Sequence, residues 1–461
     1  MEPWTLDEAA QALRGRVHGA GGVRPLGLGL DSRTLAPGEA FLALRAERDG
    51  HAFAAQAVER GAVALVVDHE LPVALPQLIV RDTLEALHAW GRLRLEAVRP
   101  PAVFAVTGSV GKTSTKELLA AAVQGWRTPG NRNNTLGLPQ ALASLPEGQA
   151  AAVLEMGMST PGEIATLVRI APPDFGLVTC IGTAHIENFP DGQEGIARAK
   201  GELVAGLRPG GTWVHLATDR WCRWLADQPW AAEFRAVRVG EREPFGWADL
   251  RSLGPRGTRF LLRTPQGEAE VLLRLPGAHQ VRNAALAGSL AVLAGTPLEE
   301  VAARLGTVEP EPGRGRLHPL GGGGWLLDES YNASPDSILA CAAALLQLPG
   351  GEPVAVLGSM REQGADAPRL HREVGQGLRA LGLGRLWAYG DHAAELAAAF
   401  GEGARAYPDF EPFRDDPAGL GALPAGARIL VKGSRHWRCE RAVAGLLDRL
   451  QAPGPGPQTQ D

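Results

Sequence analysis

Short apolar runs alternate with amphipathic segments through the middle of the chain. The run at 102–107 (AVFAVT) is apolar up to its last residue, as in a strand buried on both faces of a parallel sheet. Comparable runs occupy 152–155, 176–180 and 212–216, with segments of helical periodicity between them. The pattern predicts a parallel, doubly wound sheet, with a helix from about 114 to 123 directly after the first strand.

The same alternation continues on both sides of this region. Residues 1–83 predict a small α/β unit, and a helical segment then opens the central unit, 84–308. Residues 309–450 repeat the strand–helix rhythm of a Rossmann-like unit, although they carry no GxGxxG segment. The tail 451–461 (QAPGPGPQTQD) has a composition typical of disordered segments.

One segment departs from the alternation. Within 245–275, RFLLR and EAEVLLRL are separated by TPQG, which predicts a β-hairpin. We expect it as an antiparallel addition to the main sheet. The predicted fold class is therefore α/β with three domains: a small α/β domain, a central P-loop parallel-sheet domain and a C-terminal Rossmann-like domain.

Composition narrows the class of protein. The net charge of −5 argues against a basic nucleic-acid-binding face. The four cysteines are far apart without a CxxC pair, which argues against a zinc ribbon and a disulfide framework. The N-terminus has no signal-peptide pattern, and no apolar stretch approaches the roughly 20 residues that span a bilayer. We expect a cytoplasmic protein with no nucleic-acid partner and no membrane insertion.

A glycine-rich segment between the first buried strand and its helix carries the strongest chemical signal. It consists of Thr107, Gly108, Ser109, Val110, Gly111, Lys112 and Thr113. Glycines let backbone N–H groups converge on phosphate oxygens, and the helix N-terminus and the lysine add positive charge. The threonine hydroxyl is a candidate Mg²⁺ ligand. The segment is no strict Walker A motif, but it predicts phosphate binding.

Phosphate binding alone leaves kinases, GTPases and ligases open. A GTPase would need an NKxD-type segment, which is absent. The glycine-rich segment is the first of nine segments in a fixed order: TGSVGKTSTKE, GNRNNTLGLP, LEMGMSTPGEIATL, GTAHIENF, ARAKGEL, HQVRNAALA, PGRGRL, DESYNASPDS and VKGSR. Together they resemble the Mur ligases, and DSRTLAPGEAFLALRAERDGHAF is similar to the UDP-binding unit of that family.

The resemblance implies an ATP-dependent, amide-forming ligase of peptidoglycan synthesis that works through an acyl phosphate. Within the family, the segments are most similar to the branch that adds D-alanyl-D-alanine to UDP-N-acetylmuramoyl-tripeptide. These small molecules are the expected partners, and a monomer is expected. The runner-up is the branch that adds lysine or diaminopimelate, which is disfavoured because its DNPR-type segment is missing. Folylpolyglutamate synthases lack the opening UDP unit. A P-loop kinase or nucleotide-binding regulator would leave Glu155, His185 and Lys200 unexplained.

Those three residues are the expected partners of two Mg²⁺ ions beside ATP, together with Thr113. Glu155 ends a buried strand and His185 follows another, and the resemblance makes both of them metal ligands. The plain alternatives are a helix-capping glutamate and a solvated histidine. Lys200 is implied to carry a carbamate formed from CO₂, against the alternative of a solvated helix lysine. The resemblance thus makes Lys112, Glu155, His185 and Lys200 the catalytic set.

Further nucleotide contacts are implied in three places. Asn131, Asn133 and Asn134 form a loop that is expected to face the nucleotide phosphates and the muramoyl substrate. Asn283 is expected to contact adenine, although an asparagine at a helix start would also explain it. Arg314 or Arg316, and Asp328 at a strand end, are expected to reach the nucleotide from the third domain.

Two sets of polar residues are expected to hold the other substrates. Ser32, Arg33 and His51, within DSR and DGH, are implied UDP contacts, with ordinary turn residues as the alternative. Lys432, Ser434 and Arg435 are implied to lie near the incoming dipeptide. The chain departs from the family pattern at two places on the dipeptide side. It has GSM (Gly358-Ser359-Met360) in place of GDM, and the pair His436-Trp437 follows KGSR.

Overall fold

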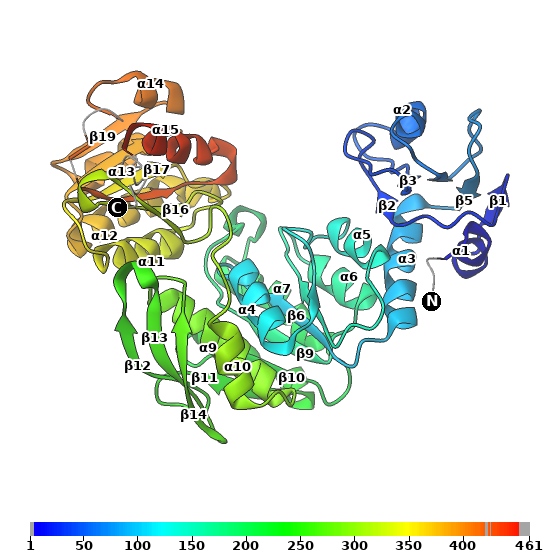
Figure 1. Cartoon of the computed structure of the whole chain (residues 1–461), viewed down its shortest axis with the longest axis horizontal. Coiled ribbons are helices and arrows are strands. Elements are labelled where there is room, and N and C mark those ends of the chain that lie inside the picture. Colours follow the sequence, from blue (N-terminus) through cyan, green and yellow to red (C-terminus); the bar gives the residue numbers. More distant parts are fainter. Residues whose placement is uncertain (1–3, 420–422, 425, 451–461) are drawn as a thin grey trace, which may run out of the picture.

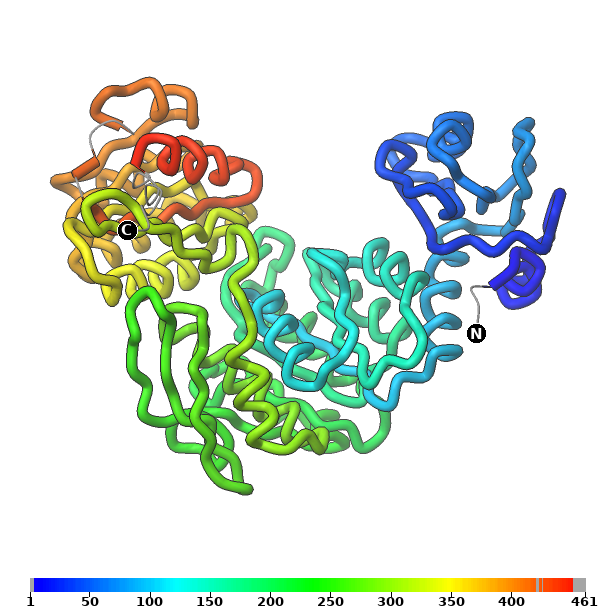
Figure 2. Tube along the Cα trace, viewed as in Figure 1, coloured from blue at the N-terminus to red at the C-terminus, as the bar shows by residue number. Residues whose placement is uncertain are grey.

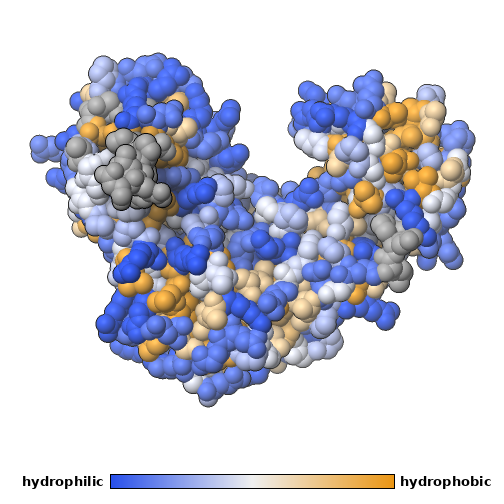
Figure 3. Space-filling model, in the orientation of Figure 1, coloured by the Kyte–Doolittle hydropathy of each residue, from blue (hydrophilic) through white to orange (hydrophobic). Residues whose placement is uncertain are grey.

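The computed structural model describes residues 4–419, 423–424 and 426–450. The tail 451–461, which the sequence predicts to be disordered, lies outside the described residues. Three α/β units follow one another along the chain, and the first and third stand on the same side of the second (Figure 1, Figure 2). In the space-filling view, hydrophilic and neutral colours dominate the surface between these two outer units (Figure 3).

The first unit is a five-stranded sheet in the order β1-β5-β4-β3-β2, in which only β1 is antiparallel to its neighbour. Its strands are β1 (Arg16–His18), β2 (Leu28–Gly29), β3 (Ala40–Leu42), β4 (Ala64–Val67) and β5 (Gln77–Ile79). Its helices are α1 (Leu6–Leu13), the 3-10 turn η1 (Gly50–Phe53) and α2 (Ala54–Glu59). Thr5 and Glu8 form a capping box that fixes the start of α1.

Helix α3 (Thr83–Val98) joins the first unit to the second. The Asp82 carboxylate caps its start by accepting from the Glu85 N–H group. Leu87 and Trp90, in its first half, pack into the core of the first unit, whereas Leu95 packs into the core of the second. One helix therefore contributes to two cores and sets the position of the first unit.

The second unit contains a six-stranded, wholly parallel sheet in the order β11-β10-β9-β6-β8-β7. Its strands are β6 (Val103–Thr107), β7 (Trp126–Arg127), β8 (Ala152–Glu155), β9 (Phe175–Val178), β10 (Thr212–Leu216) and β11 (Arg235–Val239). Its helices include α4 (Lys112–Val123), α5 (Gly137–Ala143), α6 (Glu163–Ile170), α7 (Gln193–Ala205), α8 (Arg220–Ala226), α9 (Ala278–Leu293) and α10 (Leu298–Leu305). The predicted strand–loop–helix arrangement around Lys112 is thus confirmed.

The predicted hairpin forms, but not as an addition to the main sheet. Strands β13 (Thr258–Thr264) and β14 (Gly267–Leu273) join β12 (Gly246–Ser252) in a separate, three-stranded antiparallel sheet. The alternating buried residues of β13 pack against α9, which also contacts the main sheet, and those of β14 pack against α10. The hairpin's apolar face is therefore covered by two helices, and it needs no pairing with the main sheet.

The third unit is a six-stranded sheet in the order β15-β16-β20-β17-β18-β19, parallel except for β15. Its strands are β15 (Arg316–Pro319), β16 (Trp325–Glu329), β17 (Pro353–Gly358), β18 (Arg385–Tyr389), β19 (Ala404–Tyr407) and β20 (Arg428–Lys432). Its helices include α11 (Pro335–Leu346), α12 (Ala367–Leu381), α13 (Ala393–Phe400), α14 (Phe410–Asp415) and α15 (Glu440–Leu450). The α/β fold class is confirmed, and no described helix is both long and apolar enough for a bilayer.

Candidate active site

The glycine-rich loop lies between β6 and α4 at the carboxyl edge of the central sheet. Gly111 has φ 83° and Gly108 has φ 150°, both in the region that favours glycine. A Cβ atom on Gly108 would lie 1.8 Å from Thr179 Oγ1, and one on Gly111 would lie 2.8 Å from Asn283 Oδ1. The loop therefore requires glycine at both positions. Its close approach to Asn283 also places the predicted phosphate-binding loop next to the residue that is predicted to contact adenine.

The Lys112 side chain folds back over this loop. Its Nζ donates to the carbonyl of Gly108 at 2.7 Å and lies 3.4 Å from that of Ser109. Burial lowers the pKa of the Lys112 ammonium, the charge of Glu155 partly offsets this effect, and Arg314 adds to the lowering. A cation held mainly by carbonyl oxygens is well placed to exchange them for phosphate oxygens.

Glu155, at the end of β8, is buried and receives two side-chain donors. The hydroxyl of Thr113 donates to its Oε2 at 2.9 Å, and Nδ2 of Asn133 donates to its Oε1 at 2.7 Å. The structure thus brings together three residues that the sequence analysis assigned to metal or substrate. Asn134 instead accepts from the N–H groups of Leu136 and Gly137 at the start of α5.

Lys116 belongs to this cluster, although the sequence analysis did not single it out. It is fully buried, its Nζ donates to the carbonyls of Thr128 and Gly130, and it lies 3.8 Å from Glu155 Oε2. A sequence signal was present, because the whole chain contains only four lysines, at 112, 116, 200 and 432. Nearly all other basic residues of this chain are arginines, so a lysine indicates a site that needs a compact ammonium group.

We expect Lys116→Met to destabilise the central unit, because Glu117 at 3.1 Å, Glu155 at 3.8 Å and two backbone carbonyls would lose their cationic partner. Breaking a buried ion pair from one side costs about 3–5 kcal/mol, which corresponds to a melting temperature lower by on the order of 10 °C. Differential scanning calorimetry measures this shift. Lys112→Met, whose amino group contacts only its own loop, is the matched control and should melt close to the parent. An unchanged melting temperature for Lys116→Met would contradict this role.

His185 connects the second and third units. Its Nδ1 lies 2.7 Å from Oε2 of Glu362, and the Gly364 N–H donates to Glu187 Oε2 at 3.2 Å. The hydrogen bond from His185 holds the pKa of the Glu362 carboxyl below its usual value, although burial opposes this effect. With Nδ1 engaged, Nε2 is the histidine nitrogen left for a metal, a division common among metal-binding histidines.

Lys200 lies in α7 with 2% of its surface exposed. Among the described residues, no hydrogen bond or ion pair involves its amino group. Burial, and secondly the charge of Lys112, lower the pKa of Lys200 to about 7. The alternative of a solvated helix lysine is therefore wrong, and a large fraction of this amine is uncharged near neutral pH.

The remaining nucleotide candidates lie where the third unit meets the second. Asn283, with 9% of its surface exposed, donates to Gln280 Oε1 and lies against Gly111. The guanidinium of Arg314 lies 3.8 Å from the centroid of the Tyr331 ring. Both Asp328 oxygens accept backbone N–H groups, from Gly313 and Ser330. Asp328 therefore fixes the loop that carries Arg314, and its contact with ribose remains a prediction.

A cavity of about 490 Å³ opens at the carboxyl edge of the third sheet, next to the second unit. Its lining includes Glu187, Asn332, Arg361, Glu362, Ser434, Arg435 and His436. Ser434 is buried and accepts from the Arg361 N–H, whereas Arg435 is well exposed. Two of the three residues predicted to lie near the dipeptide therefore line one cavity.

Lys432, the third of them, is buried and lies 3.4 Å from Glu329 Oε2. It does not line the cavity, and its contact with substrate stays a prediction. Ser359, one departure from the family pattern, accepts the His392 N–H group and is buried. Trp437, another departure, packs edge-on against Tyr389 and supports the core of the unit.

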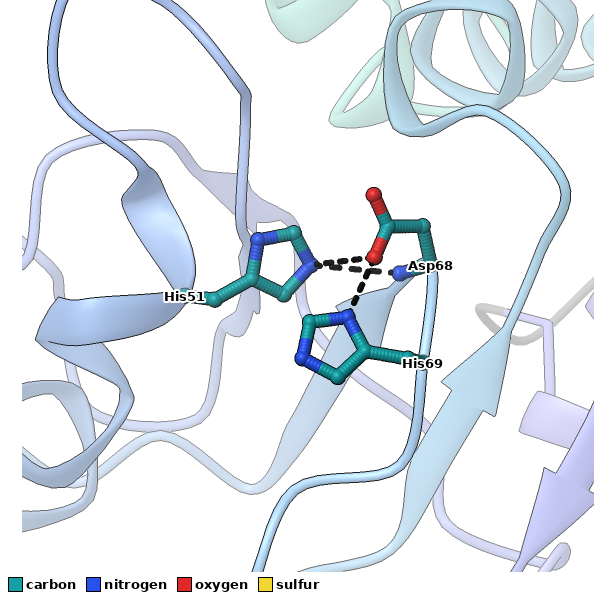
Figure 4. Close-up of side chains that lie close together, drawn as sticks. All are labelled: His51, Asp68 and His69. Atoms are coloured by element: carbon teal, nitrogen blue, oxygen red, sulfur yellow. Dashed lines mark hydrogen bonds and ion pairs between the residues drawn. The ribbon is translucent and has the colours of Figure 1, made fainter.

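The UDP candidates lie in the first unit, far along the chain from the glycine-rich loop. Ser32 is buried and donates to Gln56 Oε1, while Arg33 is exposed and pairs with Asp31. His51 is buried, its Nδ1 lies 2.5 Å from Asp49 Oδ1, and its Nε2 accepts the Asp68 N–H group. Figure 4 shows the His51 and His69 rings directed at the same Asp68 carboxylate oxygen, and the two rings stack with centroids 4.7 Å apart. Asp68 also pairs with Arg45. This network fixes the position of His51 in the DGH segment, and its contact with UDP stays a prediction.

Comparison with known proteins places this geometry in a family. Residues 106–291 match the Mur ligase middle domain, 315–435 the glutamate ligase domain of Mur ligases, and 26–124 the Mur ligase family catalytic domain. The UDP-N-acetylmuramoyl-tripeptide–D-alanyl-D-alanine ligase of Escherichia coli K12 is 36% identical, over 96% of this chain and 98% of that protein.

Two solved structures agree with this similarity. MurF from Acinetobacter baumannii superposes with a TM-score of 0.89 at 31% identity, over 97% of this chain and all of that one. MurF ligase from Thermotoga maritima in complex with ADP gives 0.79 at 27% identity, over 92% of this chain and 97% of that one. With all three family segments in order and similarity over nearly its whole length, the chain belongs to the Mur ligase family.

Proposed function

We propose that this chain is an ATP-dependent ligase that joins D-alanyl-D-alanine to UDP-N-acetylmuramoyl-tripeptide. The observation that carries the proposal is the pairing of two sites across one boundary. A phosphate loop with Lys112 lies in the second unit, and a separate polar cavity opens beside it in the third. The similarity to ligases of that name over nearly the whole chain supports the choice of substrates.

The reaction has two steps. A carboxylate oxygen of the tripeptide attacks the γ-phosphorus of ATP, the bond from phosphorus to the bridging oxygen breaks, and ADP leaves with that electron pair. The amine nitrogen of the dipeptide then attacks the acyl carbon, the C–N bond forms, and phosphate leaves as the C–O bond breaks. The proton that the amine loses goes to solvent. Lys112 stabilises the charge that spreads over the transferring phosphoryl group.

Magnesium fits the residues present. Thr113 and Glu155 offer the oxygen ligands that Mg²⁺ prefers and already lie together. His185, oriented by Glu362, would hold the second ion through Nε2. When bound, the ions supply positive charge that neutralises the phosphate oxygens.

A carbamate on Lys200 is a further part of the proposal. The ammonium first gives one proton to solvent. The uncharged nitrogen then attacks the carbon of CO₂ with its lone pair, one C=O π bond opens onto oxygen, and a second N–H proton goes to solvent, which leaves a carbamate anion. The amine is buried, has no hydrogen-bond or ion-pair partner among the described residues, and feels the Lys112 charge, so loss of its positive charge is favoured. The anion would support the metal site.

The other assignments follow from the arrangement of the units. The nucleotide would be bound by Asn283, Arg314 and Asp328. The UDP group would be bound by Ser32, Arg33 and His51. The phosphates and the muramoyl group would be bound by Asn133 and Asn134. Division at 1–83, 84–308 and 309–450 fits the three units, of which the second contains two sheets, with α3 shared between two cores. We also propose that the enzyme acts as a monomer in the cytoplasm.

The deciding experiment measures ADP release over a matrix of UDP-muramoyl peptides and amine substrates. We expect release only with ATP, a UDP-muramoyl tripeptide and D-alanyl-D-alanine together, and a pentapeptide product of matching mass. Release with a dipeptide precursor and free lysine or diaminopimelate would favour the other branch of the family. Release with no amine substrate would favour a kinase.

A further inference from the structure

The contact between His185 and Glu362 joins two residues with unusual backbone conformations. His185 has φ 63° and Glu362 has φ 64°, both in the left-handed region, which costs energy for residues other than glycine. One belongs to the second unit, the other to the third, and their side chains meet at 2.7 Å. Such conformations persist where their surroundings hold them, and they are concentrated at functional sites.

Only one of the two Glu362 carboxylate oxygens has a partner. His185 engages Oε2, whereas no hydrogen bond or ion pair involving Oε1 is found in the part of the chain that the structure describes. About half of the side chain, 51%, is accessible, and it lines the 490 Å³ cavity. The guanidinium of the neighbouring Arg361 pairs with Asp391 at 2.7 Å and makes no ion pair with Glu362 among the described residues.

Charge is distributed unevenly around this cavity. Arg435 and His436 follow β20 in the third unit, while Glu362 and Glu187 lie where the cavity meets the second unit. The Arg435 guanidinium lies 3.4 Å from Glu440, but its side chain is 65% exposed and keeps donors for a further carboxylate. Glu362 contacts His185 at 2.7 Å, and His185 belongs to the second unit, which also carries the phosphate loop. The Glu362 end of the cavity therefore lies against the unit that binds phosphate.

We infer that Glu362 Oε1 binds the ammonium group of the dipeptide, whose carboxylate points toward Arg435 and His436. This inference rests on the proposed function and adds the orientation of the second substrate. An amine at the Glu362 end is next to the site where the acyl phosphate forms, and a carboxylate pairs strongly with an ammonium. Glu362 has a binding role here: the ammonium gives one proton to solvent before its nitrogen attacks the acyl carbon, and a second as the amide forms.

Glu362→Gln is the informative variant, because the amide oxygen can still accept from His185 while the negative charge is lost. We expect kcat/KM for D-alanyl-D-alanine to fall about 10- to 100-fold, mainly through KM, as for loss of a charge-assisted hydrogen bond. KM for ATP and for the UDP substrate should stay within about twofold of the parent. Glu373→Gln, on the exposed face of α12 and paired with Arg369, is the matched control and should behave as the parent.

Hydroxylamine as the nucleophile distinguishes two causes of lost activity, weaker binding of the dipeptide ammonium and a disrupted active site. It is largely uncharged at neutral pH and converts an acyl phosphate to a hydroxamate with release of phosphate. Glu362→Gln should keep parental hydroxamate formation while losing activity with the dipeptide. Glu362→Ala, which also removes the His185 contact, should lose both.

The outcomes are distinct. Parental kinetics of Glu362→Gln with the dipeptide overturn the inference, and so does an equal loss with dipeptide and hydroxylamine, which would indicate a purely structural contact. If the parent enzyme itself does not use D-alanyl-D-alanine, the proposed function fails, and Glu362 is not at issue.

Discussion

Lys112→Ala should lower the rate of ligation about 10²- to 10³-fold, the usual effect of removing one group that stabilises transition-state charge. The Lys112 amino group contacts only carbonyls of its own loop, so its removal leaves no buried partner without a charge. The fold should therefore survive, and the melting temperature should stay close to that of the parent.

Steady-state ADP release measures the loss, and kcat should carry most of it. Lys112→Arg is the companion variant, since it keeps the charge. The 2.7 Å contact with the Gly108 carbonyl leaves little room for a planar guanidinium, so we expect arginine to restore little activity. Near-parental ligation by Lys112→Ala would remove the basis for the phosphate-loop assignment.

The sequence predicts this region well because its signals are local. Five consecutive buried residues in β6, a glycine turn and a helix are determined by neighbours in the chain, and they appear in the structure where the pattern places them. The same holds for β10, whose predicted bounds are those observed. Glycine at 108 and 111 follows from the close approach of Thr179 and Asn283, which the sequence alone does not reveal.

What the sequence did not predict depends on contacts between distant segments. The separate sheet of β12, β13 and β14 is determined by how α9 and α10 cover it, and alternation alone cannot distinguish that arrangement from a hairpin on the main sheet. Glu362 was missed because its partner, His185, lies in another unit. Lys116 was missed for a different reason, since its neighbour Lys112 already explained the motif.

The second large effect concerns Lys200. We expect Lys200→Ala to be about 10- to 100-fold less active, as when a group that supports a metal site is removed. If the parent carries a carbamate, formate or acetate should partly restore Lys200→Ala by placing a carboxylate where the carbamate stood. Lys200→Arg keeps the charge but fills the buried space, so the same acids should not restore it.

Labelling with ¹³CO₂ tests the group itself. At mildly alkaline pH most of the Lys200 amine is uncharged, because burial and Lys112 lower its pKa to about 7, and it can react. The chain has only four lysines, so few signals compete in a ¹³C spectrum, and the carbamate resonance should disappear in Lys200→Ala. Lys116→Met, at a fully buried lysine already held by two carbonyls, should keep that resonance. A resonance that survives in Lys200→Ala, or an Ala variant with parental activity, would rule out a catalytic carbamate and leave Lys200 as a buried amine.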